Sequence, residues 1–337
     1  MTDEFRPAWW LPGPHTMTMW GKFFRKSELH DVQVERIATP DGDEVSLVSD
    51  IERRAGPTVL LLHGLEGGMR SHYVAGIWAV ARQRGWQPRM LLFRTCDGRI
   101  NSARRTYHSG ETTDLELIVE TLVRRDPDTP IGLIGISLGG NVMLKWLGLR
   151  GDLVPAQVRA AVAVSTPYDL AKSSKAIDSG FARLYQWNFL RSLRRKANLK
   201  RAQYPDICSP ERLDALATMW EFDDRFTAPL HGFDDAADYY AKSSSIGFLS
   251  GIRRPTLLLS AEDDPFHPRD LLREVAGIAA GNRCVTTEFH RRGGHVGFVG
   301  GAPWRPTYYV EKRVGAFLAD HLHASSSAER TLEGRVR

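Results

Sequence analysis

Short apolar runs alternate with longer amphipathic segments along most of the chain. A continuous apolar run is typical of a strand that is buried on both faces of a parallel sheet. Strands are predicted at 58–62, 89–93, 131–136, 159–164, 256–260 and 284–289. Apolar residues spaced by three or four positions predict helices at 72–84, 112–125, 138–149, 269–279 and 307–322. This alternation predicts an α/β protein with a mostly parallel central sheet and helices on both faces.

Two internal segments depart from this alternation. Residues 32–37 and 44–48 alternate polar and apolar positions around the turn Pro40-Asp41-Gly42, which predicts an opening antiparallel hairpin. Residues 168–250 are helical in pattern and rich in aromatic side chains. We interpret them as a helical cap inserted over the carboxyl ends of the strands, where open α/β sheets bind their ligands.

The two ends of the chain differ from the core in composition. Residues 1–30 are rich in Trp, Pro and Phe, and we expect them to pack over the core as an irregular arm. Residues 323–337 are rich in Ser, Glu and Arg, which predicts a disordered tail. The predicted division is an arm at 1–30, a core at 31–167 and 251–322, a cap at 168–250 and a tail at 323–337.

Composition and charge limit the classes of partner. The 337 residues are 42% hydrophobic and 25% charged, as in ordinary globular proteins, and the net charge of +5 is too small to indicate nucleic acid binding. The longest apolar stretch, 131–149, contains several glycines together with Ser137, Asn141 and Lys145, so we reject it as a membrane span. Nothing in the sequence indicates the oligomeric state.

The cysteines and the N-terminus bear on the cellular compartment. Cys96, Cys208 and Cys284 are odd in number, lie far apart and form no CxxC pair. A disulfide framework or a zinc ribbon is therefore not expected, and a reducing cytoplasm fits best. The N-terminus has neither the basic region nor the apolar region of a signal peptide.

The strongest chemical signal is Gly135-Ile136-Ser137-Leu138-Gly139, which lies between a predicted strand and a predicted helix. A GxSxG pentapeptide in that setting is typical of a nucleophile elbow. The glycines permit a tight turn that exposes the Ser137 hydroxyl and directs the Leu138 backbone N–H to the same place. We predict Ser137 as a nucleophile and Leu138 as an oxyanion donor; the alternative is a glycine-rich junction with a bystander serine.

The loop His63-Gly64-Leu65-Glu66-Gly67-Gly68 directly follows the predicted strand 58–62. Hydrolases with a nucleophile elbow take a second oxyanion donor from the loop after an early strand. The backbone N–H of Leu65 is the candidate, and a plain tight turn is the alternative. A phosphate-binding loop is excluded because the lysine and hydroxyl residue of that motif are missing.

Two neighbouring aspartates compete for the role of the acid. Asp263 and Asp264 follow the predicted strand 256–260, where a carboxylate can fix the tautomer of a histidine and stabilise its charged form. Pro265 favours Asp264, because the acid commonly lies just before the turn that opens the next helix. Asp263 remains the alternative, and Glu262 or the unused aspartate would cap that helix or face solvent.

A histidine among small residues completes the set. His295 lies in Gly293-Gly294-His295-Val296-Gly297-Phe298 after the last predicted strand, where the glycines let the loop bring an imidazole over the serine. We interpret the nearby His290 as a surface histidine. The chain order Ser137, Asp264, His295 is that of α/β-hydrolases. This set predicts hydrolysis of acyl esters through an acyl-enzyme, with no cofactor and no metal.

These residues resemble the YheT-like branch of the α/β-hydrolases, which includes bacterial esterases and the eukaryotic ABHD1-, ABHD2- and ABHD3-type lipid hydrolases. The resemblance covers about residues 8–320. It rests on the fragments HGLEG at 63–67, YHSGET at 107–112, GISLGGN at 135–141, DDPF at 263–266 and GGHVGF at 293–298. It implies Ser137, Asp264 and His295 as the triad and short- to medium-chain esters or lipids as substrates.

The same comparison has one departure and one exclusion. Phe93-Arg94-Thr95-Cys96-Asp97-Gly98 stands where relatives usually read FRGCSG, so the resemblance does not extend to the detail of that loop. Some relatives carry an HxxxxD acyltransferase motif, but no histidine of this chain has an aspartate five positions on.

Other interpretations stay open. A thioesterase or amidase would use the same triad, and a non-catalytic binding protein could keep the hydrolase scaffold. The basic run 191–196, with Lys200 and Arg201, is interpreted as a solvated face of a cap helix rather than as a nucleic acid or lipid site. Peripheral contact with a membrane through this run and the Trp-rich arm remains an alternative.

Overall fold

A sheet of eight strands runs through the centre of the protein, in the order β1-β2-β4-β3-β5-β6-β7-β8. The computed structural model describes residues 4–322. The strands are β1 (Val32–Ala38), β2 (Glu44–Asp50), β3 (Thr58–Leu62), β4 (Gln87–Leu92), β5 (Ile131–Ile136), β6 (Val158–Val164), β7 (Thr256–Ala261) and β8 (Val285–His290). Only β1 and β2 run against their neighbours, and β3 to β8 are parallel. The predicted mostly parallel sheet is confirmed.

The apolar runs of the sequence are the buried parallel strands. Every residue of β3, β5 and β7 is buried, as a strand covered on both faces requires. Because β3, β5, β7 and β8 run in the same direction, their carboxyl ends meet at one edge of the sheet. The loops that carry the predicted chemical residues all leave from that edge.

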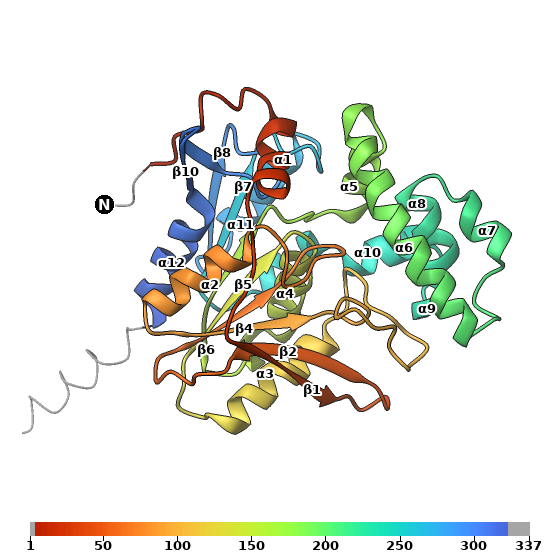
Figure 1. The fold of residues 1–337 in the computed structure, drawn as a ribbon, viewed down its shortest axis with the longest axis horizontal. Coiled ribbons are helices and arrows are strands. Elements are labelled where there is room, and N and C mark those ends of the chain that lie inside the picture. The colour runs from red at the N-terminus through yellow and green to blue at the C-terminus, as the bar shows by residue number, and fades with distance from the viewer. Residues whose placement is uncertain (1–3, 323–337) are drawn as a thin grey trace, which may run out of the picture.

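Helices cover both faces of the sheet and enclose two apolar cores. One core holds side chains of α3 (Thr113–Arg125), α4 (Leu138–Arg150) and α11 (Leu271–Ala280). The other holds side chains of α2 (Val74–Gln83) and α12 (Tyr309–Leu322), which lie together on one side of the sheet in Figure 1. The stretch 131–149 is divided between β5 and α4. Within residues 4–322, no helix is long and apolar enough to cross a membrane.

A helical insertion separates β6 from β7 and stands beside the sheet (Figure 1, green to cyan). We call residues 170–243 the insertion. Its helices are α5 (Leu170–Ile177), η2 (Gly180–Ala182), α6 (Arg183–Gln203), α7 (Pro210–Ala215), α8 (Met219–Phe222), the π-helical turn η3 (Asp223–Thr227), α9 (Ala228–His231) and α10 (Ala236–Ser243). Its apolar side chains form two small clusters separate from the sheet cores.

The N-terminal segment and the segment before α12 differ from the sequence-based expectation. The expected irregular arm contains a helix, α1 (Pro14–Phe24), whose start is favoured by the proline at its first position. The last helix was expected to begin at residue 307, but Thr307 and Tyr308 belong to β10 (Arg305–Tyr308), which pairs with β9 (Val299–Ala302). The predicted disordered tail, 323–337, lies outside the described residues.

Candidate active site

Ser137 occupies the strained turn between β5 and α4. Its backbone has φ 52° and ψ −121°, a conformation that a non-glycine residue adopts only when its surroundings enforce it. Those surroundings require glycine on either side. A Cβ on Gly135 would lie 2.5 Å from the Cα of Gly140, and a Cβ on Gly139 would collide with the carbonyl oxygens of Leu62 and His63. The GxSxG pattern is therefore a packing requirement of this junction.

His295 lies between Ser137 and an aspartate. Its Nε2 is 2.9 Å from the Ser137 hydroxyl, and its Nδ1 is 2.8 Å from Oδ2 of Asp264. The ring of Phe266 stacks on the imidazole with a centroid distance of 3.9 Å and an interplanar angle of 12°. The backbone N–H of His295 donates to the hydroxyl of Thr18 in α1, at 2.9 Å. The structure thus brings together the serine, the histidine and Asp264 of the sequence prediction.

Asp263 and Asp264 have different partners. Asp264 is buried, accepts the Phe266 N–H at 2.8 Å and contacts His295. Burial tends to raise the pKa of this carboxyl, but the charges of His295 and His267 and the two hydrogen bonds outweigh it, so its pKa lies below the ordinary value. Asp263 instead accepts the backbone N–H groups of Gly293 and Gly294, at 2.8 and 2.9 Å.

Asp263 therefore holds the loop that carries His295, while Asp264 contacts the imidazole. Burial raises the pKa of Asp263 above its ordinary value, despite the two glycine N–H groups that favour the carboxylate. His290, expected at the surface, is instead half-buried. Its Nε2 lies 3.1 Å from Glu288, and its ring contacts Phe5, so the expectation of a surface histidine is wrong.

The loop after β3 reaches Ser137 directly. A Cβ on Gly64 would lie 3.2 Å from the Ser137 Cβ, which leaves room only for glycine or a small shift. Burial lowers the pKa of His63 to about 4, so its ring is neutral at pH 7. Its Nε2 accepts the Phe93 N–H at 3.1 Å, and its Nδ1 therefore donates to the Gly64 carbonyl at 2.7 Å. The buried His63 ring thus joins the loop after β3 to the backbone of Phe93.

The two predicted oxyanion donors are available for a ligand. Among the hydrogen bonds of residues 4–322, none uses the backbone N–H of Leu65 or that of Leu138. The neighbouring N–H groups are occupied, since Gly64 donates to the Tyr73 hydroxyl at 2.9 Å and Glu66 donates to the Tyr107 hydroxyl at 3.0 Å. Leu138 opens α4, where backbone N–H groups favour negative charge.

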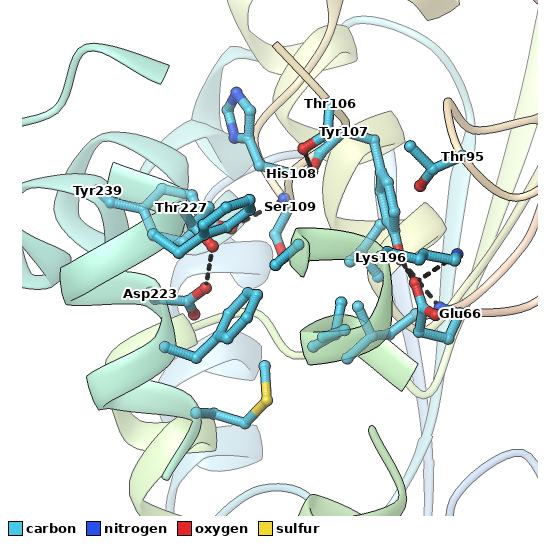
Figure 2. A pocket seen from close by; sticks show the side chains of 17 residues that line it. Glu66, Thr95, Thr106, Tyr107, His108, Ser109, Lys196, Asp223, Thr227 and Tyr239 are labelled. Carbon is cyan, nitrogen blue, oxygen red and sulfur yellow. Dashed lines mark hydrogen bonds and ion pairs between the residues drawn. The ribbon is translucent and has the colours of Figure 1, made fainter. Parts of the chain in front are cut away.

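A pocket of about 80 Å³ lies between these loops and the insertion. Leu65 and Leu138 line it from the core (Figure 2). The insertion adds apolar side chains from α6, α8 and η3: Leu193, Ala197, Met219, Phe222 and Phe226. Polar groups lie at two sides of the pocket, with Glu66, Lys196 and Tyr107 on one and Asp223, Thr227 and Tyr239 on the other (Figure 2).

Several residues around the site carry no local sequence signal. Thr18 reaches His295 from 277 positions away, and Lys196 of α6 pairs with Glu66 of the loop after β3. The basic run was expected to be a solvated face, yet Lys196 and Lys200 point inward, and Lys200 is only 1% exposed. That expectation is wrong for these two lysines, because their ammonium groups donate to acceptors of the core, the Glu66 carboxylate and the Asn101 carbonyl.

Metal ligands do not gather near the site. Over the described part of the chain, no three His, Cys, Asp or Glu side chains are arranged to hold a metal ion.

Known proteins resemble this chain in sequence and in fold. The family model described as alpha/beta hydrolase fold matches residues 57–302. YheT of Escherichia coli, whose name marks it as a candidate esterase, is 35% identical over 96% of this chain and 95% of its own. Human phospholipase ABHD3 is 25% identical over 97% of this chain and 82% of its own. The monoacylglycerol lipase of Saccharomyces cerevisiae is 30% identical over 76% of this chain and 57% of its own.

A solved structure agrees with the fold. The Pyrococcus furiosus esterase Pf2001 superimposes with a TM-score of 0.57 at 18% identity, covering 86% of this chain and 93% of that one. The family model spans most of the chain, and YheT matches nearly all of it. The chain therefore belongs to the α/β-hydrolase family, in the branch of YheT and the ABHD3 phospholipases, and is an esterase- or lipase-like hydrolase.

Proposed function

We propose that this protein is a serine-dependent carboxylic ester hydrolase that works through an acyl-enzyme. The observation that carries the proposal is the chain of contacts from Ser137 Oγ to His295 and from His295 to Asp264, at 2.9 and 2.8 Å. It lies beside two backbone N–H groups, of Leu65 and Leu138, that have no partner among residues 4–322. A nucleophile, a base, an orienting acid and an oxyanion site are the parts that acyl transfer needs.

In the proposed reaction, His295 takes the proton of Ser137 as the hydroxyl oxygen attacks the ester carbonyl. Asp264 accepts from His295 Nδ1 and stabilises the imidazolium, while the Leu65 and Leu138 N–H groups stabilise the oxyanion. His295 then protonates the departing alcohol, and an acyl-Ser137 remains. Water, deprotonated by His295, attacks the acyl carbonyl, and collapse of this second intermediate releases the acid and restores Ser137.

We propose short- to medium-chain acyl esters or lipids as substrates, with the acyl chain in the pocket between core and insertion. The pocket wall of Leu193, Met219, Phe222 and Phe226 supports an apolar group there. In this proposal, residues 168–250 act as the cap, 31–167 and 251–322 as the catalytic core, and 1–30 as an arm that supports His295. The three free thiols support a reducing, cytoplasmic location.

The test of the reaction is labelling by a fluorophosphonate, with wild type beside Ser137→Ala and with Ser165→Ala as the control. Ser165 is a buried serine whose hydroxyl accepts the Val296 N–H and which is not placed to react. We expect labelling of wild type and of Ser165→Ala, and none of Ser137→Ala. A folded wild type that is neither labelled nor active on any p-nitrophenyl ester would refute the proposal and favour the binding-protein alternative.

A substrate panel separates the esterase from its enzymatic alternatives. Matched oxygen esters, thioesters and anilides of one acyl group present the same chain to the pocket and differ only in the leaving group. We expect the highest kcat/KM for the oxygen ester. A preference for the thioester or the anilide at equal chain length would instead assign the protein as a thioesterase or amidase with the same triad.

We also propose that lipid substrates reach the site from a membrane surface. Phe181 of η2 and Leu184 and Trp187 of α6 are exposed, and α6 contains no acidic residue. Ring contacts run from Phe181 through Tyr185 and Phe266 to His295.

Basic helices with exposed tryptophan bind anionic bilayers. A larger fraction of the protein should therefore sediment with phosphatidylglycerol vesicles than with phosphatidylcholine vesicles. Trp187→Ser should lower that fraction; equal recovery with both vesicles would contradict the proposal.

A further inference from the structure

Glu66 follows the proposed oxyanion donor Leu65 and is held from three directions. Its backbone N–H donates to the Tyr107 hydroxyl at 3.0 Å, and that hydroxyl donates to Glu66 Oε1 at 2.8 Å. The Lys196 ammonium lies 2.8 Å from the same oxygen, and the Ser192 hydroxyl donates to Oε2. The side chain of Glu66 is 8% exposed. The proposed reaction has no step for this carboxylate, although four contacts converge on Glu66.

The backbone of Glu66 explains why it needs these contacts. Its φ is 55°, in the left-handed region that disfavours a side chain by roughly 1–2 kcal/mol. Such a conformation persists only where neighbouring groups enforce it. The N–H before Leu65 is bound by Tyr73, and the N–H after Leu65 is bound by Tyr107. The position of the Leu65 N–H therefore depends on how firmly both flanking residues are held.

Two of the contacts to Glu66 come from the insertion rather than from the core. Ser192 and Lys196 lie one turn apart on α6, the helix that also contributes Leu193 and Ala197 to the pocket wall. Figure 2 shows the Lys196 ammonium directed at the Glu66 carboxylate beside Tyr107. The helix that covers the substrate pocket is thus bound to the residue next to the proposed oxyanion donor.

We propose that Lys196 is a positioning residue that couples the docking of α6 to the geometry of the oxyanion site. With α6 docked, the Lys196–Glu66 pair holds Glu66 at its positive φ and the Leu65 N–H in place. Without the ammonium, a nearly buried carboxylate loses its cation and is driven toward water. The backbone of Glu66 then relaxes, and the Leu65 N–H turns away from the oxyanion. This inference rests on the proposed function.

The chain offers a matched control one turn further along α6. Lys200 also ties the helix to the core, since its ammonium donates to the backbone oxygens of Asn101 and Ala103. It is more deeply buried than Lys196, yet it has no contact with Glu66 and does not line the pocket. Loss of Lys200 should therefore lower the stability of the C-terminal end of α6, while Ser192 and Lys196 keep their contacts with Glu66.

The experiment compares Lys196→Met, Lys196→Arg and Lys200→Met in the full chain. The measurements are kcat and KM on a p-nitrophenyl ester and the affinity for a trifluoromethyl ketone, whose adduct with serine carries an oxyanion. We expect Lys196→Met to lower both kcat and the affinity for the ketone by a factor of about 10, with KM nearly unchanged. This decrease is smaller than the decrease in rate that follows the loss of a whole oxyanion donor. Lys196→Arg should recover most of both, and Lys200→Met should keep both within about twofold.

Hydrogen exchange gives a readout that does not depend on turnover. The backbone amides of residues 64–68 should exchange faster in Lys196→Met than in wild type. In Lys200→Met their exchange rates should equal those of wild type. Equal kcat, ketone affinity and exchange in Lys196→Met and wild type would overturn the proposal, as would equal losses in both methionine variants. A wild type that neither turns over ester nor reacts with fluorophosphonate would refute the proposed function, and the exchange data would still decide the coupling.

Discussion

The core and the insertion meet beside the candidate site and contribute different kinds of residue. The core carries the proposed reactive residues at the ends of parallel strands, Ser137 after β5, Asp264 after β7 and His295 after β8, and lines the neighbouring pocket with Leu65 and Leu138. These groups are held by backbone hydrogen bonds and by glycines that have no room for a side chain. The insertion supplies apolar side chains from helices that pack around clusters of their own.

This difference indicates a division of roles between the two regions. Substitutions at the strand ends should change the rate of reaction for every substrate, because the groups that we propose to touch the reacting atoms lie there. Substitutions on the pocket side of the insertion should change which acyl chains are accepted. Through the proposed coupling, the contact between Lys196 and Glu66 is the place where the insertion also acts on the rate.

The largest effect is expected at the two neighbouring aspartates. Asp264→Asn should lower kcat by about 10³–10⁴, because the amide can no longer hold the reactive tautomer of His295 or stabilise its charge. Asp263→Asn keeps one acceptor for the glycine N–H groups and should cost about tenfold or less. Steady-state kinetics on one p-nitrophenyl ester checks both variants. Equal losses would show that the two aspartates are not divided as the contacts indicate.

A second prediction concerns the glycines that the core requires. Gly139→Ala should destabilise the fold by several kcal/mol, because the new Cβ would overlap the carbonyl oxygens of Leu62 and His63. Gly277→Ala is the control, since Gly277 lies exposed within α11 and its Cβ would meet no atom within 4 Å. It should stabilise by about 0.5–1 kcal/mol. Urea unfolding measures both, and similar stabilities for the two variants would contradict the packing argument.

A third prediction tests selectivity in the insertion. Leu193→Trp places a larger ring in the pocket and should lower kcat/KM for an octanoate ester about tenfold relative to a butyrate ester. Leu184→Trp introduces the same ring on the exposed side of α6 and should leave that ratio within about twofold. A ratio that moves equally in both variants would mean that the acyl chain does not occupy this pocket.

The smallest effect is expected at Asp223, a buried acid of the π-helical turn. Burial raises its pKa to about 6, although Thr227 and Tyr240 donate to it. The folded state then binds a proton that the unfolded chain has released, so this group lowers stability as pH rises from about 4 through 6. Relative to wild type, Asp223→Asn should gain on the order of 1 kcal/mol over that range.

Thermal unfolding from pH 4 to 7 measures this gain. Asp152→Asn, at an exposed position of the core, is the control and should show no comparable change with pH. If Asp223→Asn were more stable than wild type by the same amount at every pH, the ionisation of Asp223 would not be the cause.

The sequence predicted the parts of this protein that are encoded locally. Continuous apolar runs placed β3 and β5 at their observed bounds, because a strand buried on both faces leaves no polar position. The nucleophile elbow was equally readable, since the strand, the glycines and the helix adjoin Ser137. The choice between Asp263 and Asp264 rested on Pro265 alone, and the structure adds that the former binds glycine N–H groups and the latter binds His295.

What the sequence could not predict depends on contacts between distant segments. Helix α1 has only eleven residues and contains three aromatic residues and a glycine, so its helical pattern is weak, and it is stabilised by packing on the core. The inward direction of Lys196 and Lys200 depends on acceptors near Glu66 and Asn101, about 100 or more positions away. A run of basic residues has the same appearance in sequence whether it faces solvent or a buried carboxylate.

The hydrogen bond from His295 to Thr18 has a consequence for biosynthesis. Thr18 is synthesised 277 positions before its partner His295. The backbone N–H of Ala8 likewise cannot form its hydrogen bond until the carbonyl of Val299 has been synthesised. A nascent chain that has released Ser137 and Asp264 still lacks His295 and the strand β9 that binds the N-terminal segment. Under the proposed mechanism such a chain has no base, so a ribosome stalled before residue 295 would carry an inert chain.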